Sequence, residues 1–128
     1  MKTTSCYPVF IYPKEKLTLM LEHAEKYSYM TVAHHFSHEA LEGFVLKDAS
    51  GNRVDMISPK SDALEVPEGV FGIRLNVDDY EAAVKELQAA GYEVLVPAVE
   101  TPSSYCVVLK GRPSGFGFNV VLFQHKKN

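Results

Sequence analysis

The sequence lacks the features that mark several common classes of protein. Its 128 residues include only two cysteines, Cys6 and Cys106, which are far apart and do not form a metal-type pair. A disulfide scaffold is therefore excluded. No apolar run, such as the one at 120–123, approaches the ~20 residues that span a bilayer, so we expect no membrane helix and no membrane partner. The first residues also lack the apolar core of a secretory signal, which favours a cytoplasmic protein.

The net charge is small and mildly acidic. Thirteen Lys and Arg residues against sixteen Asp and Glu residues give a formal net charge of −3. A nucleic-acid-binding protein needs a dense field of basic side chains to replace phosphate counterions, and here only Lys126 and Lys127 form a locally basic stretch. We therefore expect no nucleic-acid partner. The composition, with 46% hydrophobic and 23% charged residues, is that of an ordinary globular protein.

Two segments of similar plan follow one another along the chain. Each begins with an apolar extended run, at 7–12 and at 72–77, which predicts a strand. Each continues with apolar residues at helical spacing. The first helix is predicted over 14–25, and the second follows the N-cap residues Asp78 and Asp79 and ends at Gly91.

The ends of the two segments also repeat each other. The residues at 45–47 are echoed at 108–110, and both are followed by a Ser-Gly pair, Ser50-Gly51 and Ser114-Gly115. Such pairs favour tight turns between antiparallel strands. A duplicated strand–helix–strand–strand–strand unit, and hence an α+β fold, is the simplest interpretation. We predict a single domain over 1–128, with module one at about 5–58, a polar, proline-containing linker at 59–69 and module two at about 70–125.

Two stretches resemble the vicinal oxygen chelate superfamily, the glyoxalase/bleomycin-resistance/dioxygenase group. The stretch 48–56 is similar to the end of a module in that family, and 71–83 is similar to the family's first strand and the helix that follows it. The resemblance implies two tandem βαβββ modules whose curved mixed sheets surround a cleft. It also implies a small-molecule ligand in that cleft and a homodimer.

In metal-dependent members of that family, a divalent ion is held by side chains from the first and last strand of each module. The resemblance carries these positions onto Tyr7, Asp55, Gly72 and either Asn119 or Val121. Glycine has no side chain to donate, a neutral tyrosine is a poor ligand, and only Asp55 is a carboxylate. A catalytic divalent ion needs about three suitable protein donors. We therefore expect no metal and no other cofactor at these positions.

The histidines do not offer an obvious replacement site. His34 and His35 are neighbours on a predicted strand, and alternate side chains point to opposite faces. They therefore cannot hold one ion together. We expect these two, together with His38 and His125, to be solvated or partly buried.

Strand alternation places further polar side chains beside the family positions. Arg53 shares a face with Asp55, and Arg74 and Asn76 share a face with Gly72. Arg74 stands out because it can take the place of the ion and pair with Asp55 or with the carboxylate or phosphate of a ligand. Alternatively, Arg74 and Asp55 neutralise each other in a filled interior, or Arg74 reaches solvent at the rim.

The sequence favours a small-molecule-binding protein of the glyoxalase/bleomycin-resistance type that lacks the full metal site. Two alternatives remain open: a metal-dependent lyase, isomerase or dioxygenase of the same superfamily, and a non-enzymatic interaction module with a closed cleft. No catalytic residue can be assigned. The predicted ligand-binding cleft consists of Tyr7, Arg53, Asp55, Gly72, Arg74, Asn76, Asn119 and Val121.

Overall fold

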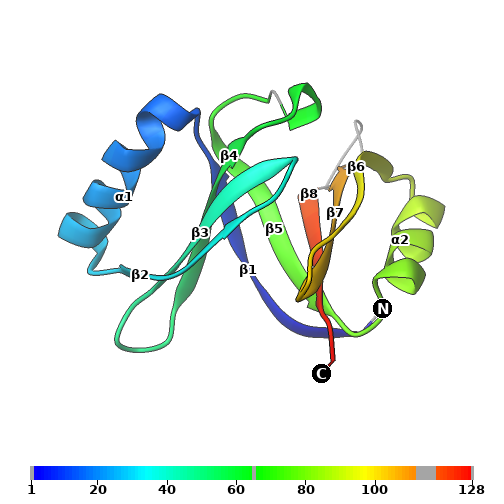
Figure 1. Ribbon diagram of the computed structural model, residues 1–128. Helices are drawn as coiled ribbons and strands as arrows, with labels where there is room; N and C mark the ends of the chain where they lie inside the picture. The colour runs from blue at the N-terminus through cyan, green and yellow to red at the C-terminus, as the bar shows by residue number, and fades with distance from the viewer. Residues whose placement is uncertain (1, 65, 112–117, 128) are drawn as a thin grey trace. The chain divides into compact units, whose positions relative to one another are not determined.

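A computed structural model describes residues 2–64, 66–111 and 118–127 (Figure 1). The elements follow the predicted order, which confirms an α+β fold built from two βαβββ modules. They are β1 (Thr3–Ile11), α1 (Lys14–Ser28), β2 (Thr31–Ser37), β3 (Leu41–Lys47), β4 (Arg53–Pro59), the short 3-10 helix η1 (Asp62–Leu64), β5 (Gly69–Val77), α2 (Tyr80–Ala89), β6 (Glu93–Glu100), β7 (Ser104–Lys110) and β8 (Asn119–His125).

The chain divides into two compact units. The first unit is Tyr7–Phe71, and the second combines Met1–Cys6 with Gly72–Asn128. The N-terminal part of β1 therefore belongs with the second unit. Two hydrogen bonds hold it there: Thr4 Oγ1 donates to the backbone oxygen of Asn76 over 3.2 Å, and Asn76 Nδ2 donates to Ser5 Oγ over 2.6 Å.

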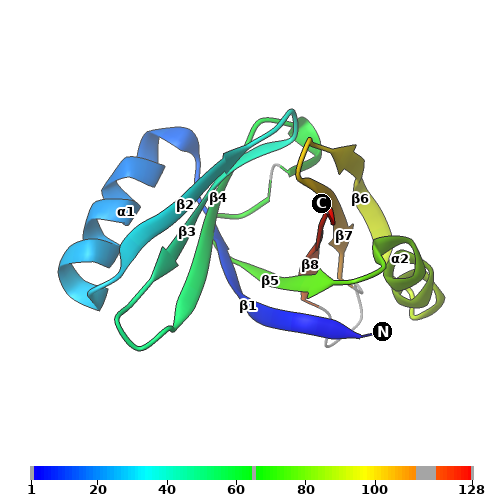
Figure 2. The same cartoon turned by 60° about the horizontal axis from the view of Figure 1, so that its bottom comes forward.

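The first unit is a four-stranded mixed sheet with α1 on one face (Figure 2). Its strand order is β2-β3-β4-β1, with β1 parallel to β4 and the other pairs antiparallel. Leu17 and Ala24 of α1 pack on Leu46 and Met56 of the sheet. The turn between β3 and β4 forms at the predicted Ser-Gly pair, where Gly51 adopts a φ of +87° that suits glycine.

The second unit repeats this plan with α2 on its sheet. Its strand order is β5-β8-β7-β6, with β5 parallel to β8 and the other pairs antiparallel. The predicted N-cap is confirmed, because Asp79 Oδ1 accepts a hydrogen bond from the backbone N–H of Ala82 over 3.1 Å. Ala83 and Leu87 of α2 pack in a core with buried residues of β5, β7 and β8. The predicted turn at Ser114-Gly115 lies outside the described residues.

Two element ends differ from the sequence-based prediction. Helix α1 continues past Glu25 to Ser28 and ends at Tyr29, which has a φ of 55° and acts as a left-handed C-cap. The connection between the modules is shorter than 59–69, because Pro59 ends β4 opposite Leu41 and Gly69 begins β5. Proline is tolerated at the end of a strand, which is where Pro59 lies.

The helices of the described residues are too short or too polar to span a membrane.

Candidate functional site

The predicted site residues lie on the sheet faces that point away from the two helices. In the first unit, Met56 packs under α1, so its neighbour Asp55 points to the opposite face. In the second unit, Leu75 packs under α2, so Arg74 and Asn76 point to the opposite face. The alternation expected from the sequence therefore holds in both strands.

Arg74 is a buried cation with a fixed orientation. Its side chain is 3% exposed, and its Nε donates a hydrogen bond to Asn76 Oδ1 over 3.0 Å. The guanidinium carbon lies 4.0 Å from the ring centroid of Phe123 on β8. Because Asn76 is itself bonded to Ser5, the chain of contacts from Ser5 to Arg74 holds the guanidinium in one place.

Cys106 borders this cluster but is not a nucleophile. It pairs with Phe123 across β7 and β8 and is 2% exposed. Burial raises the pKa of the Cys106 thiol to about 12, although the positive charge of Arg74 acts in the opposite direction. The thiol is therefore protonated at neutral pH, and thiolate chemistry is not available to it.

The position of Gly72 leaves no room for a side chain. Gly72 pairs with Asn119 on the parallel strand β8, and a Cβ atom at Gly72 would lie 1.9 Å from the backbone oxygen of Asn119. The side chain of Asn119 is also engaged, because its Oδ1 accepts a hydrogen bond from the backbone N–H of Gly111 over 3.0 Å. Val121 is the register partner of Arg74 and is buried.

A second polar cluster lies in the first unit. Asp55 is 1% exposed, and its Oδ1 lies 3.6 Å from Nε of Arg53. The guanidinium carbon of Arg53 lies 3.8 Å from the ring centroid of Tyr7. Arg53 therefore contacts both other members of the cluster, through charge and through the aromatic face.

The structure thus brings the eight predicted residues into three local groups. Arg74 lies with Asn76 and Val121, Gly72 lies with Asn119, and the third group is Tyr7, Arg53 and Asp55. Arg74 and Asp55 belong to different units, and their pairing stays a prediction. Two further members of the Arg74 cluster, Phe123 and Ser5, were not predicted from the sequence. Alternation along β8 offered a signal for Phe123, since it shares a face with Asn119 and Val121.

The histidines are distributed as expected. In the β2–β3 register His34 pairs with Val45 and His35 pairs with Phe44, so the two imidazoles point to opposite faces. His38 lies in the turn after β2, where its Nδ1 accepts a hydrogen bond from the backbone N–H of Ala40 over 3.1 Å. Burial lowers the pKa of His38. Within the described ranges, no group of three or more His, Cys, Asp or Glu side chains is arranged to hold a metal.

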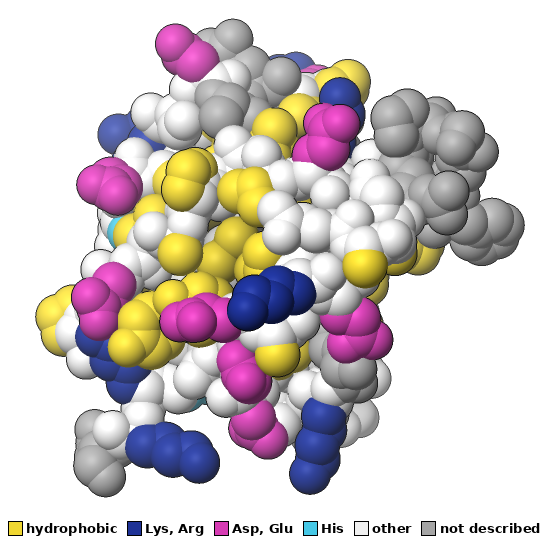
Figure 3. All heavy atoms as spheres, turned by 90° about the vertical axis from the view of Figure 1, so that its right-hand side faces the viewer, with side chains coloured by type: hydrophobic (Ala, Val, Ile, Leu, Met, Phe, Trp, Pro, Cys, Tyr) yellow, Lys and Arg dark blue, Asp and Glu magenta, His cyan; other side chains and the backbone are white. Residues whose placement is uncertain are grey.

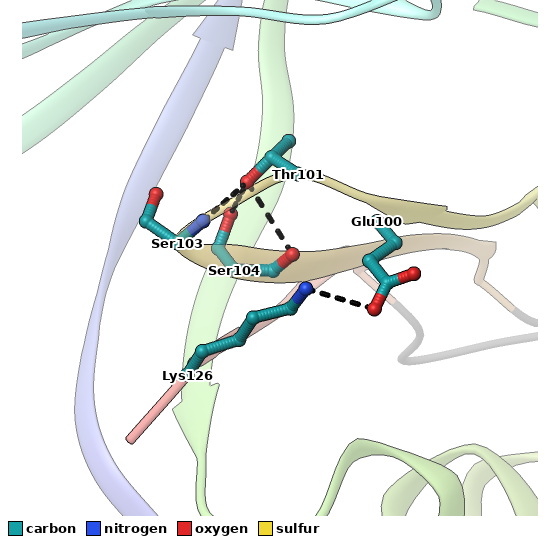
Figure 4. Close-up of polar contacts among 5 residues, drawn as sticks. All are labelled: Glu100, Thr101, Ser103, Ser104 and Lys126. Carbon is teal, nitrogen blue, oxygen red and sulfur yellow. Dashed lines mark hydrogen bonds and ion pairs between the residues drawn. The ribbon is translucent and has the colours of Figure 1, made fainter. Parts of the chain in front are cut away.

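The hydroxyl groups near the β6–β7 turn serve the turn itself (Figure 4). The Oγ1 atom of Thr101 lies 2.7 Å from Oγ of Ser104 and accepts a hydrogen bond from the N–H of Ser103 over 3.4 Å. Lys126 follows β8 and ties it to this hairpin, because its Nζ donates to Glu100 Oε1 over 2.8 Å. These contacts are those of a closed hairpin, and they do not form a nucleophile–base pair.

Hydrophobic side chains reach the surface on the α2 side of the second unit (Figure 3). Val94 on the edge strand β6 is 38% exposed, and Val84 of α2 is only partly buried. The β6–β7 register shifts twice, between Val94 and Val96 and between Val96 and Val99. Such irregularities discourage the pairing of an edge strand with another chain.

Comparisons with known proteins identify the fold. No protein-family model matches the sequence, and no curated protein matches it. Among solved structures, methylmalonyl-CoA epimerase from Mycobacterium tuberculosis aligns with a TM-score of 0.70 and 13% identity, over 98% of this chain and 90% of that chain. A variant of methylmalonyl-CoA epimerase from Streptomyces coelicolor, in complex with 2-nitronate-propionyl-CoA, aligns with a TM-score of 0.69 and 17% identity, over 96% and 95% of the two chains.

A larger enzyme shows the same likeness over part of its length. A mutant of 4-hydroxymandelate synthase from Streptomyces coelicolor aligns with a TM-score of 0.58 and 15% identity, over 95% of this chain and 48% of that chain. These neighbours have the fold of the vicinal oxygen chelate superfamily, which confirms the resemblance at the level of fold. At these identities the fold does not specify the reaction or the ligand.

Proposed function

We propose that this protein binds a small molecule carrying a carboxylate, phosphate or carbonyl group, that Arg74 holds this group, and that no divalent metal ion takes part. The observation that carries the proposal is the buried, oriented guanidinium of Arg74, which lies against Phe123 and is bonded to Asn76.

The surroundings of Arg74 favour ligand binding on physical grounds. A guanidinium is planar, permanently charged and suited to two parallel hydrogen bonds with a carboxylate or phosphate. In a buried setting such bonds are stronger than in water. The contacts with Asn76 and Phe123 fix the plane of the group before a ligand arrives, so little side-chain entropy is lost on binding.

The residues at the family's metal positions do not fit a divalent ion. A histidine cannot replace Gly72 without moving the backbone of Asn119, and the Asn119 side chain is bonded to Gly111. Asp55 lies beside the positive charge of Arg53, which competes with a cation for the carboxylate. One carboxylate of this kind is too few donors for a stable site.

Ligand binding can be tested with anionic probes of increasing size. Malonate, inorganic phosphate and methylmalonyl-CoA are suitable, and the last is bound by one of the structural neighbours, a methylmalonyl-CoA epimerase. Each probe is titrated by calorimetry into the wild type and into Arg74→Ala, Arg74→Lys and the exposed control Lys110→Ala. We expect at least one probe to bind wild type and Lys110→Ala equally, and to bind Arg74→Ala at least tenfold more weakly, a loss of about 1.4 kcal/mol. Arg74→Lys keeps the charge but not the planar fork, so its binding is intermediate.

Two measurements separate this function from its competitors. Removing one member of a buried ion pair costs several kcal/mol of stability. If Arg74→Ala shows such a loss and no probe binds the wild type, Arg74 has a structural role. The non-enzymatic interaction module is then favoured. If elemental analysis of the purified protein finds stoichiometric zinc, nickel, iron or manganese, the metal-dependent enzyme is favoured. We expect no such metal and no change of melting temperature with chelator.

A further inference from the structure

A cavity of about 430 Å³ that is open to solvent lies between α1 and the sheet of the first unit. Small-molecule sites typically have volumes of ~300–1,000 Å³ and a mostly apolar lining. The apolar part of this lining comes from α1, from the residue after its C-terminus, and from β1 and β4. It consists of Phe10, Met20, Ala24, Met30, Val54 and Met56.

The fold itself does not require this cavity. The second unit has the same βαβββ plan, and there α2 packs on a continuous core of buried side chains that includes Leu87, Leu109 and Leu122. The core under α1 has four buried residues against eight under α2, and in both units further hydrophobic side chains are only partly buried. The core under α1 therefore contains fewer fully buried side chains than the core under α2.

The lining defines the chemistry of a ligand. Three of the four methionines of the chain contribute to it, and methionine side chains adapt their shape and make favourable sulfur contacts with aromatic rings. Of the described residues that line the cavity, none is Asp, Glu, Lys or Arg. A charged ligand would find no Asp, Glu, Lys or Arg partner among these residues to compensate for the hydration that it loses.

The entrance to the cavity is polar and aromatic. His23 and Tyr27 of α1 are exposed, line the cavity and contact each other edge-to-face with ring centroids 5.5 Å apart. Their ring nitrogens and hydroxyl group can each form a hydrogen bond. A ligand with an apolar ring and one polar group can therefore insert the ring and leave the polar group at the entrance.

We infer that the α1 cavity is a second binding site, formed by residues other than those around Arg74, for an uncharged aromatic compound that carries one hydroxyl or carbonyl group. This site lies on the helix side of the first sheet, whereas Asp55 points to the opposite face. It therefore does not depend on the proposed function.

The test uses 2-naphthol, which is uncharged at neutral pH, and its carboxylate counterpart 2-naphthoate. Protein labelled with ¹³C at the methionine methyl groups is titrated with each probe and followed by NMR. We expect 2-naphthol to cause saturable shifts of the Met20, Met30 and Met56 methyl signals, with a Kd below about 1 mM, and 2-naphthoate to bind at least tenfold more weakly. Shifts that increase linearly to the solubility limit, or saturable binding that leaves these three signals unchanged, would overturn the inference.

A filled-cavity variant gives an independent readout. Ala24 is a buried core residue of α1 that also lines the cavity, so we expect the larger side chain of Ala24→Leu to extend into it. We expect this variant to be as stable as the wild type and to bind 2-naphthol at least tenfold more weakly. The matched control is Ala83→Leu in α2, which meets a filled core and should lower stability, but should leave 2-naphthol binding intact. Unchanged binding in a folded Ala24→Leu protein contradicts the proposed site; if that variant does not fold, the wild-type titration decides alone.

Discussion

Replacing Gly72 with alanine tests how closely β5 approaches β8. The added Cβ would lie 1.9 Å from the backbone oxygen of Asn119, and within 3.0 Å of its carbonyl carbon and its nitrogen, which is closer than real Cβ atoms come to such neighbours. Because the obstacle is the backbone of a paired strand, it cannot be removed by a change of side-chain rotamer. The strands must separate locally or change register.

The expected cost is at the upper end of the range for overpacking, which is typically 1–3 kcal/mol. We therefore expect Gly72→Ala to lower the free energy of unfolding by about 3 kcal/mol. For a chain of this length that corresponds to a melting temperature lower by about 12 °C. Urea unfolding followed by circular dichroism measures the free energy, and calorimetry measures the melting temperature.

Gly43→Ala is a matched control on a strand of the first unit. There the added Cβ would also clash, but with the outer atoms of the Phe36 ring and not with backbone. The ring can rotate away, so we expect a smaller loss of about 1 kcal/mol. If Gly72→Ala is as stable as the wild type, or if Gly43→Ala is the more damaging change, the close approach of β5 and β8 is wrong. A ligating side chain at position 72 would then fit between the two strands.

Three further predictions concern titration, thiol reactivity and assembly. Burial lowers the pKa of His38 below its usual 6.5, so the unfolded chain binds the proton more tightly than the folded chain. The free energy of unfolding should therefore fall as the pH drops below about 6.5. His38→Asn keeps a hydrogen-bond acceptor for the N–H of Ala40, and in urea unfolding between pH 8 and pH 5 it should show a smaller fall than the wild type. Cys6 is exposed and Cys106 is buried. A chromogenic disulfide reagent should therefore react with one thiol in the native protein and with two after unfolding. Rapid reaction of both thiols in the native protein would contradict the burial of Cys106. We also expect a homodimer, for which light scattering at tens of micromolar should give twice the 14.3 kDa chain mass, whereas a monomer mass would refute it.

The element order was predictable because the sequence repeats both the spacing of its apolar residues and the residues that cap helices or form turns. Apolar spacing indicated the two helices, Asp79 marked a helix start, and Gly51 marked a turn. These are local signals, and each fixes the conformation of only a few residues. The ends of elements are less sharply marked: Pro59, at the start of the predicted linker, is the last residue of β4.

The candidate site was predictable only in part, because strand alternation gives the face of a residue but not its partners. Alternation placed Arg74 and Asn76 together, and they are hydrogen-bonded. It did not show that Phe123 lies under the guanidinium, because that contact depends on the register between β5 and β8. The cavity beside α1 was equally hidden, since the apolar face of a helix looks the same in sequence whether the core beneath it is filled or open.

The buried Arg74 and the partly buried Arg53 share one physical feature, which is a guanidinium group lying over an aromatic ring. Arg53 lies 3.8 Å from the ring centroid of Tyr7, and Arg74 lies 4.0 Å from that of Phe123. Removing a guanidinium from water is costly, but an aromatic face attracts the cation without consuming its N–H donors. An arginine held in this way keeps its charge and its hydrogen-bonding geometry while losing mobility. Under the proposed function, this allows Arg74 to present a positive charge to a ligand without a metal ion and without the ligand set that Gly72 cannot supply.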